Sequence, residues 1–591
     1  MERAADLIIR TLCEAGADRI FMISGRGILY LTDAAARCEA LQTVCTYHEQ
    51  GASYAAMAYA AAKNSIAVCL VSTGCAAANA VTAALCAYQD GLPVVFLSGN
   101  NPLSENSRHT GVPIRTYGSQ EADIIPVVSS VTKYAVMLED PDTISAELEK
   151  ALYLAQEGRK GPVWIDVPLD IQNAHIDSET QTHFAPPAAA VYDPQAAAAA
   201  EALDSAERPV LLIGGGSADC TEEISALSEQ YDIPVVFSPA ACDVYGAAHP
   251  HAIGAVGSIG GSRAGNFAVQ NSDLVLAAGT KLCSQLTGAR EQFARAARIL
   301  AVDLDKAEHR KDGVHIERLI HCDAKQFFAA LLETGCRSKH SAWMQKCLHW
   351  KEIFSLEREE FVRQLRAEDR LDLYIFAAEL EAQLPPDAAV ITDAGFEELI
   401  IPSAIRYKPG QRCLFPKAQG AMGYAIPAII GAYHAGKQHI VCVVGDGSVM
   451  MNIQELGIIA AAGIPAKIFI IRNNMYAVIR KRQHDLFRRR TVGNDPSDGV
   501  PAPDFAKLAE GFGIRTHLAE NCTQLRALLP EIMQSDAPEI TLIDTDPEQK
   551  YFHESYARNE QGRIVRRPIE DMSPFLDRAL LSEEMLIPTL E

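Results

Sequence analysis

Short apolar runs that alternate with helical, often alanine-rich stretches are the feature of this sequence that most restricts its fold. The alternation occurs in three separate blocks of the chain. The runs that we expect to form strands are residues 43–47, 66–71, 93–97 and 163–167, then 209–213, 233–237, 273–277 and 298–302, and finally 440–444 and 467–471. Strands that alternate with helices are typical of a parallel sheet covered by helices. The sequence therefore predicts an α/β protein with three doubly wound parallel-sheet domains.

The length of the chain also requires several domains. A single core stops growing near roughly 250–300 residues, and this chain has 591. We predict a first domain over 1–177, a central domain over 195–340, a third domain over 371–550 and a C-terminal tail over 551–591. The proline- and alanine-rich stretch 178–199 is expected to be a linker that leads into a helix. The first and third blocks have similar size and strand rhythm.

Charge and cysteine usage exclude several classes of partner. The chain has 75 acidic and 53 basic residues, a formal charge of −22, which would repel nucleic acid and anionic membranes. No apolar stretch reaches the ~20 residues that span a bilayer, and the start of the chain lacks a signal-peptide pattern. The fifteen cysteines have no metal-ligand spacing and are expected to be reduced. We expect a cytoplasmic protein without nucleic-acid or membrane partners.

One strand, helix and strand in the third block carry the strongest chemical signal. The strand 440–444 ends at Gly445-Asp446-Gly447, and the strand 467–471 ends near Asn474, with a helix expected over 453–462. A right-handed βαβ unit brings the carboxyl ends of both strands to one edge, so Asp446 and Asn474 should converge. Their oxygens suit Mg²⁺ when a phosphate supplies further ligands, and the turn amides would meet that phosphate. Either motif alone is more simply a turn or a loop, but together they predict a magnesium–diphosphate site.

A second signal lies in the first block. Glu49 follows the strand 43–47 and begins an alanine-rich helix, which again is a strand's carboxyl end. A glutamate at this position alone would more simply interact with the helix dipole. It also suits a site in which one buried carboxylic acid must hold or move a proton.

The two motifs together resemble those of enzymes that depend on thiamine diphosphate (ThDP). Asp446 is followed 28 positions later by Asn474, and Glu49 lies in Glu-Gln-Gly-Ala, as in the family's diphosphate-binding and activating motifs. The resemblance implies that Asp446, Asn474 and the carbonyl of Tyr476 hold Mg²⁺. It further implies that Glu49 activates a cofactor held by another subunit, so that the protein is at least a homodimer, with a homotetramer left open.

The resemblance covers essentially the whole chain and is closest to acetolactate (acetohydroxyacid) synthase large-subunit-like proteins. It is carried by Ser72-Thr73-Gly74, Gln120-Glu121, Thr132-Lys133-Tyr134, Ala421-Met422-Gly423 and Met451-Asn452-Ile453-Gln454-Glu455-Leu456. It implies catalytic roles for Glu49, Gln120 and Lys133. The residues that it assigns to cofactor binding are Gly25, Gly74, Asn79, Gln419, Met422, Gly445, Gly447, Ser448 and Tyr476. It assigns Arg482 and Ile479 to the substrate.

Departures from the synthase pattern bear on the substrate and on flavin. Arg482 stands where the synthase usually has tryptophan, so the acceptor is expected to carry a different anionic or polar group. Residues 254–261, 279–281, 303–305 and 322–324 match the places that hold FAD in the synthase. Ile259 replaces a histidine there and Lys281 an arginine, so the resemblance leaves FAD open. Gly214-Gly215-Gly216 alone favours close backbone packing over dinucleotide binding.

The expected function follows from this resemblance. It implies a ThDP- and Mg²⁺-dependent carboligase that decarboxylates a 2-oxo acid, pyruvate or similar, and transfers the acyl carbanion to a carbonyl acceptor. A non-ligating 2-oxo acid decarboxylase is the alternative, but only His109 lies where decarboxylases carry a histidine pair. A non-catalytic homologue is the third hypothesis, which the intact Glu49, Asp446 and Asn474 disfavour.

Overall fold

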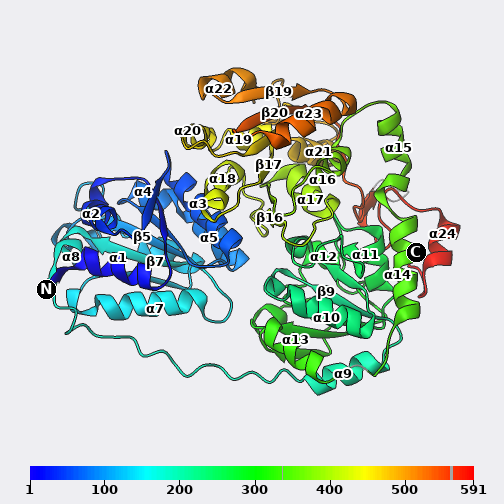
Figure 1. Cartoon of the computed structure of the whole chain (residues 1–591), viewed down its shortest axis with the longest axis horizontal. Helices are drawn as coiled ribbons and strands as arrows, with labels where there is room; N and C mark the ends of the chain where they lie inside the picture. Colours follow the sequence, from blue (N-terminus) through cyan, green and yellow to red (C-terminus); the bar gives the residue numbers. More distant parts are fainter. Residues whose placement is uncertain (336, 559–562, 591) are drawn as a thin grey trace.

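Three parallel six-stranded sheets organise the chain (Figure 1). The computed structural model describes residues 1–335, 337–558 and 563–590. Each sheet lies within one of the predicted domains and is flanked by helices. The predicted fold class is therefore confirmed. None of the helices described in these ranges is long and apolar enough to cross a membrane.

The first domain has the strand order β3-β2-β4-β5-β7-β6. Its strands are β2 (Arg19–Met22), β3 (Gln42–Cys45), β4 (Ala67–Val71), β5 (Val94–Asn100), β6 (Tyr134–Met137) and β7 (Val163–Pro168). Its main helices are α1 (Ala4–Glu14), α2 (Leu29–Arg37), α3 (Glu49–Lys63), α4 (Cys75–Asn79), α5 (Val81–Asp90), α6 (Ile125–Val128), α7 (Ile144–Gln156) and α8 (Leu169–Asn173). The short β1 (Glu2–Arg3) pairs with β8 (His175–Ile176) and joins the two ends of the domain.

The central domain follows a long segment without helix or strand, which Figure 1 shows as an extended connection to α9 (Ala196–Ser205). Its strand order is β11-β10-β9-β12-β13-β14, so the order reverses between β9 and β12. The strands are β9 (Pro209–Ile213), β10 (Val235–Phe237), β11 (Ala252–Ala255), β12 (Leu274–Ala278), β13 (Arg298–Asp303) and β14 (Arg318–His321). The helices are α10 (Thr221–Tyr231), α11 (Arg263–Gln270), α12 (Ser284–Thr287), α13 (Ala324–Glu333) and α14 (Ser341–Ile353).

The third domain has the order β16-β15-β17-β18-β20-β19. Its strands are β15 (Ala389–Ile391), β16 (Arg412–Leu414), β17 (Ile440–Gly445), β18 (Lys467–Arg472), β19 (Arg515–Ala519) and β20 (Glu539–Asp544). Its helices, after α15 (Glu360–Ala367), are α16 (Leu373–Glu381), α17 (Gly395–Ala404), α18 (Ala425–His434), α19 (Asp446–Val449), α20 (Leu456–Ala461), α21 (Ala477–Leu486), α22 (Phe505–Gly511) and α23 (Cys522–Gln534). The expected helix 453–462 is shorter, because residues Ile453–Glu455 form a 3₁₀ turn before α20.

The first and third domains share one topology. Numbered within each domain, both sheets have the strand order 2-1-3-4-6-5. The two domains also share an apolar core, in which α3 packs against α18. The helix backbones touch, since a Cβ on Gly431 would overlap the carbonyl oxygen of Ala55. This contact fixes the orientation of the two similar sheets relative to each other.

The segment expected to be a C-terminal tail is instead packed on the central domain. Asn266 on α11 donates to the carbonyl oxygen of Ile569 at 2.9 Å, and Arg263 donates to that of Met572 at 3.1 Å. The segment contains β21 (Tyr556–Arg558), β22 (Ile564–Arg566) and α24 (Arg578–Glu584). Its described residues are therefore part of the folded body.

Candidate active site

Glu49 lies at the carboxyl edge of the first sheet. It is the first residue of α3, directly after β3 and a short connection. His48 caps the helix by accepting a hydrogen bond from the Gln50 amide at 3.1 Å. Asn79, the last residue of α4, donates to the Glu49 carboxylate at 3.0 Å. The predicted activating acid and the predicted cofactor-binding Asn79 are thus in direct contact.

The glycine turns after β2 and β4 lie at the same edge. Gly74 has a φ of +64°, and a Cβ there would overlap the carbonyl oxygen of Gln120. A Cβ on Gly25 would overlap the hydroxyl of Ser72. Only glycine permits these close approaches. The structure therefore brings Gly25, Gly74 and Gln120 to the edge that carries Glu49.

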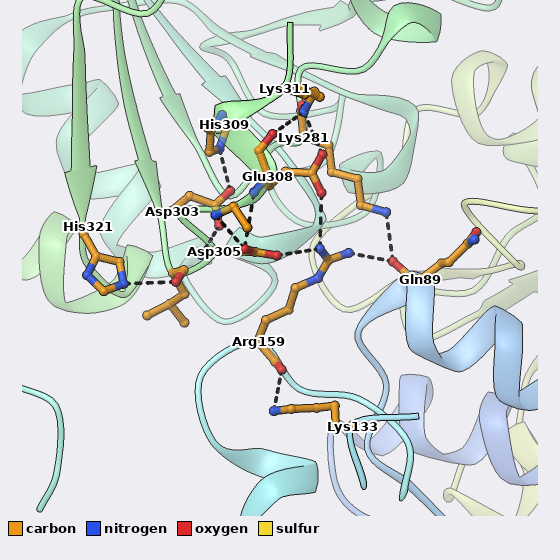
Figure 2. Close-up of polar contacts among 12 residues, drawn as sticks. Gln89, Lys133, Arg159, Lys281, Asp303, Asp305, Glu308, His309, Lys311 and His321 are labelled. Atoms are coloured by element: carbon orange, nitrogen blue, oxygen red, sulfur yellow. Dashed lines mark hydrogen bonds and ion pairs between the residues drawn. The ribbon is translucent and has the colours of Figure 1, made fainter. Parts of the chain in front are cut away.

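Lys133 lies elsewhere, and we remove it from the predicted catalytic group. It directly precedes β6, which places it at the amino edge of the first sheet. Its amine donates to the carbonyl oxygens of Glu157 at 2.6 Å and Arg159 at 2.8 Å. Burial lowers the pKa of Lys133. Its charged amine therefore holds the backbone turn at residues 157–159 beside the central domain. Figure 2 shows the hydrogen bond to the carbonyl oxygen of Arg159.

Asp446 occupies the carboxyl edge of the third sheet. It begins α19 at the end of β17, and its carboxylate accepts the amides of Gly447 at 2.8 Å, Asn473 at 3.1 Å and Asn474 at 2.6 Å. Burial raises its pKa to about 6, and these three amides oppose the shift. The two strand ends that were expected to converge therefore do so.

Tyr476 closes the other side of this turn. Its ring packs directly on Gly447, where a Cβ would overlap the ring. Its amide donates to the Asn494 carbonyl at 2.8 Å, and its own carbonyl oxygen accepts the Arg480 amide at 2.9 Å at the start of α21. A carbonyl oxygen has a second lone pair, so this helical bond leaves it able to bind a cation.

The two residues expected to face the substrate lie on α21, which follows β18. Ile479 is 48 % exposed. Burial raises the pKa of Tyr551, and the positive charge of Arg482 opposes that shift. Arg480 and Lys481 are paired with carboxylates, whereas the described residues offer no such partner to Arg482. Its charge remains available to a ligand.

A buried aspartate missed in the sequence holds the Met422 segment. Asp393 accepts the amides of Gly423 at 3.1 Å and Ala425 at 3.2 Å, and the hydroxyl of Ser448 at 2.5 Å. Asp393 therefore connects Ser448 to the backbone of the segment that carries Met422. Residues 391–395 repeat the strand, aspartate and glycine pattern of residues 444–447, and this was the signal that could have revealed it.

Two further acids missed in the sequence lie in the first turn of α17. Glu397 and Glu398 are largely buried, and burial raises the pKa of each to about 8. A Cβ on Gly445 would lie 3.4 Å from the Glu397 carboxyl group, beside the Asp446 turn. At neutral pH these carboxyls are therefore largely protonated and add little negative charge to a diphosphate site.

All three domains meet at the end of α5. Gln419 donates to the Gln89 side chain at 2.7 Å, and Asp90 accepts the amides of Lys417 at 2.9 Å and Ala418 at 3.0 Å. Lys281 of the central domain donates to the Gln89 carbonyl oxygen at 2.8 Å. The predicted cofactor residue Gln419 thus belongs to a loop that the other two domains fix in place.

One of the stretches expected to hold FAD, residues 303–305, takes part in an ion-pair cluster with Arg159 of the first domain (Figure 2). Arg159 of the first domain lies 3.2 Å from Asp305 and 3.3 Å from Glu308, and it also donates to the Gln89 carbonyl oxygen. Lys311 pairs with Glu308 at 2.6 Å. The pKa values of Asp305 and Glu308 are lowered by these cations, against the effect of burial. In these pairs two cations, Arg159 and Lys311, face two carboxylates, Asp305 and Glu308.

Two other stretches assigned to the flavin, 322–324 and 279–281, make contacts within the protein. Asp323 caps α13 through the Gln326 amide at 3.0 Å. The amide of Gly216 donates to the Gly279 carbonyl oxygen at 2.9 Å, and a Cβ on Gly214 would overlap the same oxygen. These glycines bring the loops after β9 and β12 into backbone contact, at the point where the strand order reverses. Close backbone packing is what the Gly214-Gly215-Gly216 motif predicted.

The two half-sites are not joined within this chain. Among the described residues, no hydrogen bond or ion pair links Glu49 to Asp446, Asn474 or Tyr476. The chain thus carries an acid at one sheet edge and a cation- and phosphate-compatible turn at another.

Comparison with known proteins identifies the family of the chain. Three domain models of the thiamine pyrophosphate enzymes match the chain: the N-terminal TPP binding domain over residues 2–125, the central domain over 196–331 and the C-terminal TPP binding domain over 393–545. The chain therefore belongs to the thiamine pyrophosphate enzyme family.

The curated relatives narrow the class. The acetolactate synthase isozyme 1 large subunit of Escherichia coli (strain K12) is 30 % identical over 93 % of this chain and 95 % of the relative. The acetolactate synthase large subunit of Corynebacterium glutamicum is 32 % identical over 90 % of this chain and 84 % of the relative. The probable acetolactate synthase large subunit of Methanocaldococcus jannaschii is 30 % identical over 92 % of each. The chain is thus an acetolactate synthase-like, ThDP-dependent enzyme that forms C–C bonds, which confirms the resemblance.

Proposed function

We propose that the protein is a Mg²⁺-dependent carboligase that decarboxylates pyruvate or a similar 2-oxo acid and transfers the acyl unit to a carbonyl acceptor. The observation that carries the proposal is the pair of half-sites, Glu49 with Asn79 at one sheet edge and Asp446 with Asn474 at another. The similarity to acetolactate synthases supports ligation over simple decarboxylation.

The residues present fit ThDP and Mg²⁺. The close contact of Gly447 with Tyr476 leaves a turn without a side chain, where backbone amides can meet a diphosphate. One carboxylate, one side-chain amide and one carbonyl are hard oxygen ligands that suit Mg²⁺ together with phosphate oxygens. We assign Asp446, Asn474 and the carbonyl of Tyr476 to the metal, and Gly445, Gly447 and Ser448 to the diphosphate.

Bound ThDP supplies a nucleophilic carbon and an electron sink for decarboxylation. Glu49 holds or donates a proton at the cofactor's pyrimidine ring, and Asn79 orients the Glu49 carboxylate. Met422 supports the cofactor's shape from a segment that Asp393 and Ser448 fix. Gly25, Gly74 and Gln120 line the edge beside Glu49, where Gln120 contacts substrate.

Arg482 sets the preference for the acceptor. Its unpaired guanidinium on α21 would bind an anionic or hydrogen-bonding group of the acceptor, and Ile479 would offer an apolar surface beside it. We therefore propose an acceptor that carries a carboxylate or several hydroxyls.

A flavin does not fit the arrangement shown in Figure 2. Its diphosphate would add two negative charges to a cluster in which Arg159 and Lys311 already pair with carboxylates. We therefore derive no step through a flavin.

We further propose that the active enzyme is at least a homodimer, because in the described part of the chain no hydrogen bond or ion pair joins Glu49 to the metal turn. A tetramer would pair two such dimers. The described cysteines are free thiols, which supports the cytoplasm as the compartment.

Product analysis tests the proposal. The protein is incubated with pyruvate, ThDP and Mg²⁺, with and without a panel of 2-oxo acids, aldehydes and keto sugars. We expect a ligated product whose amount depends on the acceptor. Release of free aldehyde alone would make the protein a decarboxylase, and no ThDP-dependent turnover of any 2-oxo acid would overturn the proposal.

A further inference from the structure

A carboxylate of the third domain contacts the segment that carries Glu49. Glu455 accepts the amide of Tyr47 at 3.1 Å and the amide of His48 at 3.1 Å. Its second oxygen lies 3.2 Å from the Tyr47 amide. These two amides belong to the residues that immediately precede Glu49. They come from the first domain, whereas Glu455 ends the 3₁₀ turn before α20.

The residue that follows Glu49 is held by the same part of the third domain. Asn452 donates to the side chain of Gln50 at 2.9 Å and to the carbonyl oxygen of Gly423 at 2.8 Å. The helix beyond is fitted closely, since a Cβ on Gly51 would lie 2.5 Å from the Glu455 carboxylate. Both sides of Glu49 are therefore fixed by residues Asn452 and Glu455.

The burial of Glu455 indicates that packing alone does not explain a carboxylate at this position. The residue is fully buried, and burial raises its pKa to about 7, against the two amides and Gln454. A buried carboxyl group is costly unless it is hydrogen-bonded, so a leucine here would pack at lower cost if packing were the only requirement. These contacts reach the residues on either side of Glu49, whereas the Glu49 carboxylate itself is bound by Asn79.

We propose that Glu455 is a positioning residue that sets the orientation of Glu49 by accepting the two amides before it. This inference rests on the proposed role of Glu49. Glu455 touches neither substrate nor cofactor, and it acts by holding the backbone from which the Glu49 side chain extends. Because a misplaced catalytic group can cost on the order of 100-fold in rate, loss of this contact should lower kcat far more than it changes KM.

Two substitutions separate positioning from other roles. Glu455→Ala removes both acceptors. Glu455→Gln keeps one carbonyl oxygen at the place where Oε1 accepts both amides, but it cannot ionise or carry a proton. Glu539→Ala is the matched control, because it removes another buried carboxylate of the third domain. Glu539 is the first residue of β20 and pairs with His517 of β19.

Hydrogen exchange in the protein without cofactor is the direct measurement. We expect the peptide that contains the Tyr47 and His48 amides to exchange faster in Glu455→Ala, and at the wild-type rate in Glu455→Gln and in Glu539→Ala. With ThDP and Mg²⁺ bound, Glu455→Ala should lower kcat between 10- and 100-fold, within the roughly 100-fold limit for misplacement. Glu455→Gln should restore most of the rate.

Three outcomes would overturn the inference: unchanged exchange and kcat in Glu455→Ala, a KM effect alone, or a Glu455→Gln variant as impaired as Glu455→Ala. Failure of the proposed function gives a different result. In that case the wild-type protein shows no ThDP-dependent turnover, while the exchange measurement still reports whether Glu455 protects the two amides.

Discussion

The first and third domains have the same strand order, yet their equivalent loops carry different chemistry. The third strand of each sheet leads into a different turn. In the first domain β4 leads into Ser72-Thr73-Gly74, and in the third domain β17 leads into Gly445-Asp446-Gly447. The fourth, β5 and β18, ends at an asparagine pair in both, Asn100-Asn101 and Asn473-Asn474. At these two loops, one carboxylate therefore distinguishes the edge to which we assign the metal from the equivalent edge of the first domain.

The asparagine pairs show the same difference. In the first domain, Asn100 donates to Asp166 at 2.7 Å and to the Ala122 carbonyl at 3.0 Å, so its amide serves the fold. In the third domain it is instead the backbone amides of Asn473 and Asn474 that donate to the Asp446 carboxylate. The shared fold thus supplies two similar edges, and a few side chains distinguish the edge of the proposed metal site from the edge of the proposed activating acid.

Asp446→Ala should have the largest effect, because it makes the third domain resemble the first at this turn. We expect ThDP affinity in the presence of Mg²⁺ to fall by on the order of 100-fold, as ligand losses do at metal sites. A fluorescence titration with and without Mg²⁺ measures it. Asp544→Ala at the end of β20 is the control, and a ThDP titration unchanged by Asp446→Ala would contradict the site.

Glu49→Gln should separate binding from turnover. We expect ThDP and Mg²⁺ to bind as in the wild-type protein, while turnover falls below roughly a tenth, since the amide cannot take part in proton transfer. Steady-state kinetics beside a binding titration measure both. The exposed Glu39→Gln in the same domain is the control. A variant that retained most of the activity would remove Glu49 from its role.

Asp166→Asn tests whether the first domain uses its polar edge for stability. Burial raises the pKa of Asp166 to about 7, so the folded protein keeps a proton that the unfolded chain loses above about pH 4. Rising pH between these values therefore lowers the free energy of unfolding, by at most about 1.4 kcal/mol per pH unit.

The variant should lack this contribution, so that its stability relative to the wild-type protein increases from pH 4 to pH 7. Urea unfolding at several pH values measures the difference. A constant difference across this window would show that Asp166 is ionised in the folded protein.

The smallest expected signal concerns the central domain, which contributes to neither half-site. Because Arg159 and Lys311 are matched by carboxylates, we expect the purified protein to lack the visible absorbance of a flavin. Stoichiometric flavin after denaturation would show that the cluster of Figure 2 opens to admit it.

Much of this organisation could be predicted from the sequence, because hydrophobic alternation and strand-terminal motifs are local. The strand 209–213 was predicted with its observed bounds, and Asp446 and Asn474 were assigned to one edge from connectivity alone. The role of Lys133 rested on the resemblance alone; Lys133 directly precedes β6, and a residue before a parallel strand lies at the amino edge of the sheet.

Two of the remaining site residues were missed for different reasons. Asp393 was missed because β15 has only three residues. Glu455 was missed because its hydrogen bond to Tyr47 spans 408 positions of the sequence. Such a contact exists only once two domains have packed, so neither residue type nor spacing reveals it.

Subunit complementation tests the central claim most directly, namely that one active site combines Glu49 of one subunit with Asp446 of another. Glu49→Gln and Asp446→Ala chains are each assayed alone and after co-expression. Each variant alone should be inactive, whereas random pairing should recover about a quarter of wild-type activity, because half of the dimers would contain one intact site. A mixture that stays inactive, although mixed dimers form, would show that both residues must belong to the same chain.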